Sequence, residues 1–140
     1  MCLIINDNVR KPKIVEIEID GEKRIVYVGY KSVWHERLST RIQSTCFYYI
    51  WNTGWNQSGR TLATKPLSHE SMVDNTVDEG FHFYTDLEDC ESETATLESM
   101  MMKCFVLPED VIAFGYNPAL IHGELSLGFA ATKCYVEKLP

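Results

Sequence analysis

The chain has 140 residues, the size of one ordinary domain, and its composition of 45% apolar and 24% charged residues is typical of a folded globular protein. This composition argues against a disordered, collagen-like or coiled-coil chain. A net charge of −7 disfavours binding to duplex nucleic acid, and no apolar run is long enough to span a membrane.

The first part of the chain predicts a hairpin, a helix and a strand. Residues 13–20 alternate apolar and polar, meet Asp20-Gly21 and resume a β-rich pattern over 24–30, which predicts a β-hairpin with a tight turn. Apolar residues at helical spacing predict a short helix over 32–43. Residues 45–51 are dense in β-forming types and are predicted to form a strand.

Residues 52–78 are rich in turn-forming types and have no sustained period. We predict a long loop or insert there, within a single domain that spans residues 1–140. Because a loop of this length is uncommon in a compact domain, it is a candidate for a functional segment.

The second half predicts one helix among short strands. Residues 80–84 alternate as a strand, and Thr85 with Glu88 is a capping-box signature that opens a helix whose apolar face continues to Met101. Further strands are predicted at 103–107, 110–114, 124–129 and 132–137.

This order of elements predicts an α+β fold with a mostly antiparallel sheet, an N-terminal β-hairpin and one or two short helices. The edge of the first hairpin or of the last strand could pair across a two-fold axis, so a homodimer is a further expectation.

Cysteine and histidine spacing predicts neither disulfides nor a metal site. The five cysteines include no Cys-x-x-Cys pair, and the four histidines show no metal-binding spacing. No phosphate-binding glycine loop is present in the sequence either. We therefore expect reduced thiols, no metal and no cofactor. The start of the chain lacks a basic leader, so we expect a cytoplasmic protein.

Charge is unevenly distributed along the chain. Residues 1–65 carry a net charge of +4, whereas residues 66–102 contain ten acids and no Lys or Arg. Such an acidic surface could steer a basic protein partner. The alternative is a solvated helix face, since acids are also favoured in a first helical turn. The candidate partner-binding residues are Asp86, Glu88, Asp89, Glu91 and Glu93.

The basic middle region interleaves aromatic rings with cations. Flat rings can stack on a base while guanidinium and ammonium groups bind phosphates, which is the chemistry of a nucleotide site. The alternative is an aromatic core beneath a basic surface. The candidate ligand-binding residues are Lys31, Trp34, Arg37, Arg41, Tyr49, Trp51, Trp55 and Arg60.

A catalytic interpretation centres on His82 and Tyr84. Side chains alternate along a strand, so these two are expected on one face, where His82 could act as a base. Together with Glu124 they can be arranged as in ADP-ribosyltransferase-like enzymes that act on a nicotinamide dinucleotide, although no spacing demands it. The alternative is a half-exposed strand histidine with no catalytic role.

Three stretches resemble a loose set of small phage and bacterial proteins. They are Tyr30-Lys31, Gly80-Phe81-His82 with the capped segment behind it, and Ala130 to Leu139. That set has a Tyr-Lys early strand, a Gly-Phe-His strand before a helix, and a closing strand of the form Ala-Ser-x-Lys. The resemblance implies a phage or mobile-element origin and no mechanism.

Taken together, these features predict a small binding protein in the host-cell cytoplasm that counters or redirects a host defence system. It would sequester a nucleotide-type signal at the basic aromatic region or inhibit a host protein through the acidic segment. The alternative function is the ADP-ribosyltransferase-like enzyme.

Overall fold

The computed structural model describes residues 3–35, 42–44, 49–58, 76–77, 79–93, 99–121 and 123–140. These residues form a 12-stranded, antiparallel sheet with one α-helix, and strand accounts for 64% against 9% helix. The predicted α+β class is therefore wrong, because the fold is nearly all-β.

The strands are β1 (Leu3–Ile5), β2 (Ile14–Ile19), β3 (Glu22–His35), β4 (Ile42–Ser44), β5 (Ile50–Trp51), β6 (Gly54–Gln57), β7 (Thr76–Val77), β8 (Phe81–Tyr84), β9 (Ser99–Val106), β10 (Val111–Ile121), β11 (Glu124–Ala131) and β12 (Lys133–Val136). The described helices are α2 (Leu87–Glu93) and the 3₁₀ turn η2 (Pro108–Asp110).

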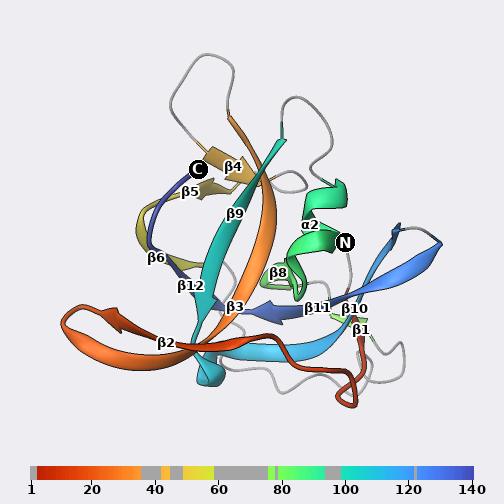
Figure 1. The fold of residues 1–140 in the computed structure, drawn as a ribbon, viewed down its shortest axis with the longest axis horizontal. Coiled ribbons are helices and arrows are strands. Elements are labelled where there is room, and N and C mark those ends of the chain that lie inside the picture. Colours follow the sequence, from red (N-terminus) through yellow and green to blue (C-terminus); the bar gives the residue numbers. More distant parts are fainter. Residues whose placement is uncertain are drawn as a thin grey trace.

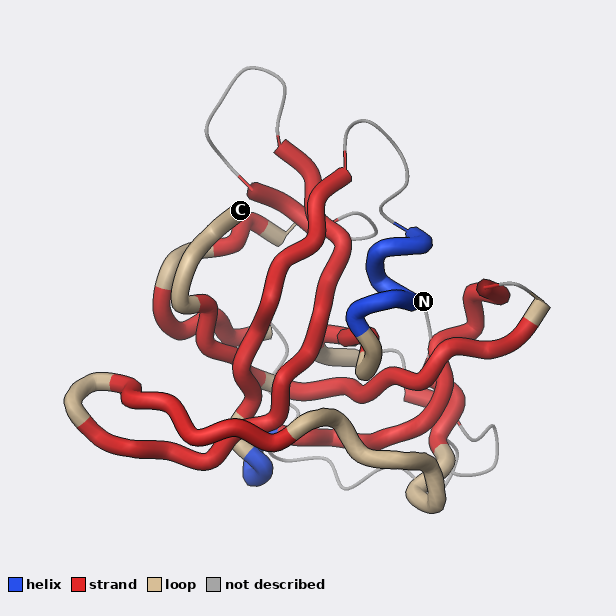
Figure 2. Tube along the Cα trace, in the orientation of Figure 1, coloured by secondary structure: helices blue, strands red, loops and turns tan. Residues whose placement is uncertain are grey.

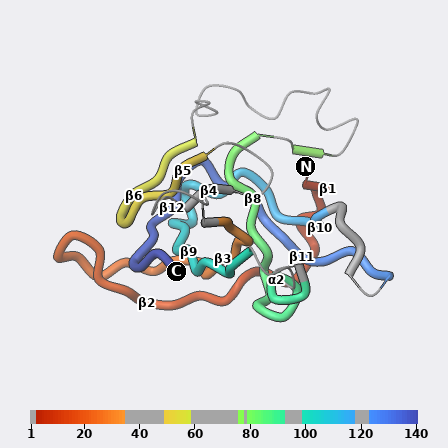
Figure 3. Tube along the Cα trace, turned by 90° about the horizontal axis from the view of Figure 1, so that it is seen from above, coloured from red at the N-terminus to blue at the C-terminus, as the bar shows by residue number. Residues whose placement is uncertain are grey.

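The sheet is organised around the long strand β3. Its strand order is β6-β12-β9-β3-β8-β11-β10-β1-β7, with β2 and β4 also paired to β3 and β5 paired to β4. In Figure 1, β3 and β9 run side by side while β10 and β11 cross below them. From above, β12, β9, β3 and β8 curve around one interior, and α2 lies beside β8 and β3 (Figure 3).

The predicted N-terminal hairpin is confirmed. β2 and β3 pair from Ile19↔Glu22 to Ile14↔Tyr27. The two turn residues, Asp20 and Gly21, have φ angles of 53° and 82°, the left-handed values that a tight hairpin turn requires. The hairpin projects from the rest of the sheet (Figure 2).

The helix predicted over 32–43 is wrong wherever the structure describes it. Residues 32–35 belong to β3 and residues 42–43 to β4. Val33 pairs with Met100 of β9 and with Ser44 of β4. Strand pairing on both sides therefore overrides a local apolar spacing that also fitted a helix.

The helix predicted to begin after Thr85 does begin there, but it is short. α2 ends at Glu93, and Met101, which was assigned to its apolar face, lies in β9. The strands predicted at 80–84, 103–107, 110–114, 124–129 and 132–137 are present with shifted bounds. Within the segment 52–78, which was predicted to be a loop, Gly54–Gln57 forms β6, which pairs with β12, and Thr76–Val77 forms β7. Residues 59–75 and 78 of this prediction lie outside the described residues.

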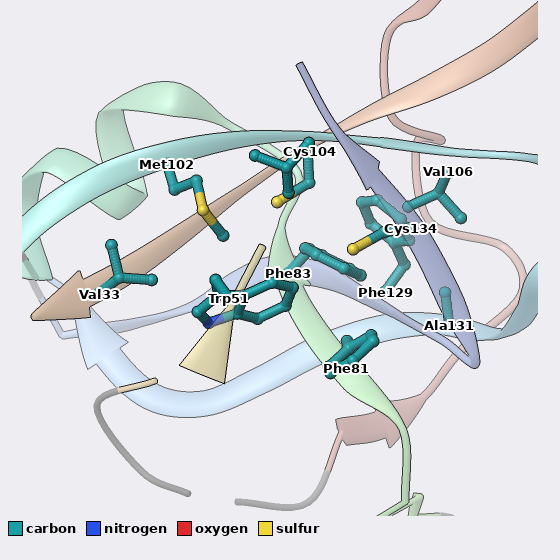
Figure 4. Packing of buried hydrophobic residues seen from close by; sticks show 11 residues of the cluster. Val33, Trp51, Phe81, Phe83, Met102, Cys104, Val106, Phe129, Ala131 and Cys134 are labelled. Atoms are coloured by element: carbon teal, nitrogen blue, oxygen red, sulfur yellow. The ribbon is translucent and has the colours of Figure 1, made fainter. Parts of the chain in front are cut away.

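Side-chain alternation divides the molecule into an interior and two outer clusters. Phe83, Phe129, Met102 and Trp51 fill the interior, and Figure 4 shows them pointing toward one another from different strands. Outside the β3–β9 pair, a second cluster lies beneath the hairpin and contains Ile19, Val26, Val28, Phe105 and Leu107. A third, against β10 and β11, contains Leu3, Val77, Ala113 and Ala130.

Candidate functional site

Three of the eight predicted ligand-binding residues meet at the interior. The Lys31 ammonium donates a hydrogen bond to the His82 carbonyl oxygen at 2.9 Å. The same nitrogen lies 5.9 Å from the ring centroids of both Trp51 and Phe83. Tyr49 packs edge-on against Trp51 with ring centroids 4.8 Å apart. A cation and two aromatic rings from distant segments therefore share one environment.

Hydrogen bonds within the protein hold the residues around Tyr49 and Trp51 in place. The Tyr49 hydroxyl donates to the Asn56 side-chain oxygen at 3.1 Å, and the Asn56 amide donates to the carbonyl oxygens of Asn52 and Gly54. Burial raises the pKa of Tyr49, which keeps its hydroxyl protonated. Trp51 is only 2% exposed. The rings near Lys31 thus serve as packing.

Trp55 lies on the opposite face of the sheet, in the second cluster. Its indole nitrogen donates to an Asp20 carboxylate oxygen at 3.2 Å, which joins β6 to the hairpin turn. The Lys133 ammonium lies 4.2 Å from the Trp55 ring centroid, and Tyr135 packs edge-on with centroids 5.3 Å apart. Three neighbours therefore already contact this ring.

The other predicted ligand-binding residues do not join either group. Trp34 is 39% exposed, and strand alternation places it on the opposite face of β3 from Lys31. Arg37, Arg41 and Arg60 lie outside the described residues. The structure thus brings together Lys31, Tyr49 and Trp51, and separates them from Trp34 and Trp55.

The three candidate catalytic residues do not converge. His82 and Tyr84 share a face of β8, but the His82 ring nitrogen contacts the Glu79 carbonyl oxygen at 3.0 Å and Tyr84 is only 6% exposed. Tyr84 pairs with Gly128 of β11, and Glu124 lies four residues before Gly128. At about 3.3 Å per residue that places Glu124 about 13 Å along the strand.

The acidic candidates gather at α2. Asp86 forms an ion pair with Arg10 at 2.6 Å, and Glu88 and Glu91 are exposed. Leu87, 38% exposed, stands between Asp86 and Glu88. Asp89 is half-buried, and the side chain of Glu93 lies outside the described residues. The start of α2 therefore presents carboxylates around one exposed apolar side chain.

The three described cysteines are buried and free. Burial raises the pKa of Cys90 to about 12 and that of Cys134 well above its ordinary value. Such thiols are protonated at neutral pH and are poor nucleophiles. Among the described residues, no group of three or more His, Cys, Asp or Glu side chains is arranged to hold a metal ion.

Sequence reasoning missed the partners that fix these residues in place. Lys133 and Tyr135 come from β12 and Asn56 from β6, and all three are joined by the β6–β12 pairing. Their period-two alternation was visible in the sequence, but the register that brings β12 beside β6 was not.

Comparisons with known proteins return no relative. No protein-family model matches the chain, and no curated protein or solved structure matches it. Within the part of the chain that the structure describes, no helix is long and apolar enough to cross a membrane.

Proposed function

We propose that this chain is a small, non-enzymatic binding protein that recognises a host protein through the acidic surface at the start of α2. The observation that carries the proposal is the pair of exposed acids Glu88 and Glu91 next to the exposed Leu87, with Asp86 beside them already ion-paired with Arg10. An apolar anchor with charged surroundings is a common arrangement for a protein interface.

Charge supports a basic partner. The whole chain carries −7, and residues 66–102 account for ten of its acids without a single Lys or Arg. A field of one sign accelerates encounter with a partner of opposite sign, and it weakens as salt is added. The partner surface would therefore be basic with an apolar recess for Leu87.

In a phage-encoded protein, as the sequence resemblance implies, this binding would take place in the host-cell cytoplasm and would counter or redirect a host defence system. The proposal needs no metal, cofactor or reaction.

A nucleotide-type signal is the second candidate ligand. Its support is the juxtaposition of Lys31 with Tyr49 and Trp51. Against it, the Lys31 ammonium already has the His82 carbonyl oxygen as a partner, and Trp51 is almost fully buried. A base could stack there only if these side chains moved.

The enzyme alternative has less support. An ADP-ribosyltransferase-like site needs its side chains around one dinucleotide, whereas Tyr84 is buried and Glu124 lies far along β11 from it.

Native mass spectrometry of protein purified from its own host tests the proposal. We expect a co-purifying polypeptide that is lost when Glu88 and Glu91 are both changed to Lys. The matched control changes the exposed acids Glu124 and Glu137 to Lys, which alters the net charge equally at other places. We expect this control to retain the polypeptide.

Two results would overturn the proposal. A small mass that absorbs near the nucleotide ultraviolet maximum, released on unfolding, would favour the second candidate. Equal loss of the polypeptide in both variants would mean that net charge, and not the α2 surface, determines binding.

A further inference from the structure

The strand β2 has an edge with no neighbour among the described residues, since it pairs with β3 alone. The Val28 amide donates to the Lys13 carbonyl oxygen at 2.8 Å, which fixes the alternation of this ladder. In an antiparallel pair every second residue turns its peptide groups away from the partner. Counting from Lys13, those residues are Ile14, Glu16 and Glu18, and their N–H and C=O groups are a template for a further strand.

Two exposed isoleucines lie near this edge, Ile14 on β2 itself and Ile25 one strand further in, on β3. Ile14 is 58% exposed and Ile25 is 60% exposed. Ile25 pairs with Glu16 and Ile14 with Tyr27, so the two isoleucines are diagonal neighbours on one face of the hairpin. The opposite face carries the buried Ile19 and Val26. The hairpin therefore carries apolar side chains on both faces, and the two isoleucines on one face are exposed.

The charge on the uncovered face is mainly acidic. Glu16 and Glu18 belong to the free edge and are both exposed, and the Lys23 ammonium lies 3.9 Å from a Glu16 carboxylate oxygen with its own side chain largely exposed. An exposed pair of this kind contributes little and is easily exchanged. Both carboxylates are thus accessible to cations on an incoming strand.

This charge pattern distinguishes between possible occupants. A second copy of this chain, paired antiparallel over most of β2, would place Glu16 opposite Glu16 or Glu18. Like charges directly opposite in a ladder are destabilising. A strand that carries Lys or Arg at alternate positions would instead place cations opposite these acids.

We propose that the free edge of β2 binds an extended basic segment of another protein as an added antiparallel strand. Basic side chains would lie opposite Glu16 and Glu18, and an apolar side chain would cover Ile14 and Ile25. Main-chain hydrogen bonds supply affinity in this binding mode, and alternate side chains supply specificity. The hairpin tip extends away from α2 in both views (Figures 1 and 3), so the part of this edge next to the tip lies apart from the α2 surface, and the Arg10–Asp86 ion pair lies beyond its other end.

Fluorescence anisotropy with a labelled peptide of alternating lysine and valine tests this proposal. We expect it to bind the wild-type protein, whereas a peptide of alternating glutamate and valine does not bind. Glu16→Gln removes one carboxylate but keeps the backbone N–H of residue 16. It should weaken binding only a few-fold.

The decisive variant is Glu16→Pro. It removes the same charge as Glu16→Gln, but it also deletes an outward N–H and places a ring in the path of the incoming strand. Proline is tolerated at a strand edge whose N–H faces solvent, so the β2–β3 ladder should remain, as circular dichroism can confirm. We expect binding at least about tenfold weaker than that of Glu16→Gln, which corresponds to about 1.4 kcal/mol.

Ile25→Thr is the test variant to use if Glu16→Pro does not fold. It keeps a β-branched residue on the neighbouring strand β3. It should weaken binding several-fold, while the Glu88→Lys and Glu91→Lys pair should leave binding within two-fold of the wild type, because those two acids lie outside the β2 edge. The proposal is wrong if the wild type binds neither peptide or both equally. It is also wrong if the Pro and Gln variants bind alike or if, where Glu16→Pro does not fold, Ile25→Thr binds like the wild type.

Discussion

Trp55 was predicted to bind a ligand, and the structure instead gives it three packing partners, so its truncation distinguishes the two roles. Trp55→Ala removes a hydrogen bond to Asp20, a cation contact with Lys133 and an edge-on contact with Tyr135. Each is worth about 0.5–1.5 kcal/mol at a partly exposed site. We therefore expect the free energy of unfolding to fall by about 3 kcal/mol.

Two companion variants make this number interpretable. Trp55→Phe keeps a ring but loses the indole donor, and should cost about 1 kcal/mol. Ile25→Ala truncates a side chain of the same hairpin that is 60% exposed, and should cost about 1 kcal/mol or less. Urea unfolding followed by circular dichroism measures all three. If Trp55→Ala lowered the free energy of unfolding no more than Ile25→Ala, the Trp55 ring would not hold the hairpin in place. A role of Trp55 in ligand binding would then be the better explanation.

Two further predictions concern the interior and a partly buried carboxylate. A Cβ added at Gly29 would lie 2.7 Å from a Phe129 ring carbon and 2.9 Å from the Phe83 Cβ, so Gly29→Ala should lower the free energy of unfolding by about 1–3 kcal/mol in urea; wild-type stability would contradict the packing described. Burial raises the pKa of Asp110, whose Oδ2 has no hydrogen-bond partner among the described residues, so the unfolded chain releases this proton at lower pH than the folded one. The free energy of unfolding of the wild type should therefore fall, relative to that of Asp110→Asn, as pH rises through the raised pKa. A difference in free energy between the two proteins that does not change with pH in urea titrations would contradict this.

The local elements that carry their own signals could be predicted from the sequence. Asp20-Gly21 determines the hairpin because these two residues accept the left-handed backbone of a tight turn. Thr85 and the acids behind it correctly mark where α2 begins. Neither signal depends on a distant part of the chain.

The errors arise where distant pairing determines the structure. Val33 and Trp34 fitted a helical spacing, but pairing with Met100 and Ser99 extends β3 through them. The same error mixed two faces of the sheet in one predicted ligand site. Once residues 22–35 are known to be a strand, alternation alone separates Lys31 from Trp34. The approach of Trp51 and Tyr49 to Lys31 still requires the tertiary fold.

The central claim is that this chain binds a basic protein through α2, and native mass spectrometry of the host-purified protein tests it most directly. We predict a polypeptide partner with the wild type and with the Glu124→Lys and Glu137→Lys control, and none with Glu88→Lys and Glu91→Lys. A released nucleotide, or a polypeptide that persists when the α2 charges are reversed, would contradict the claim.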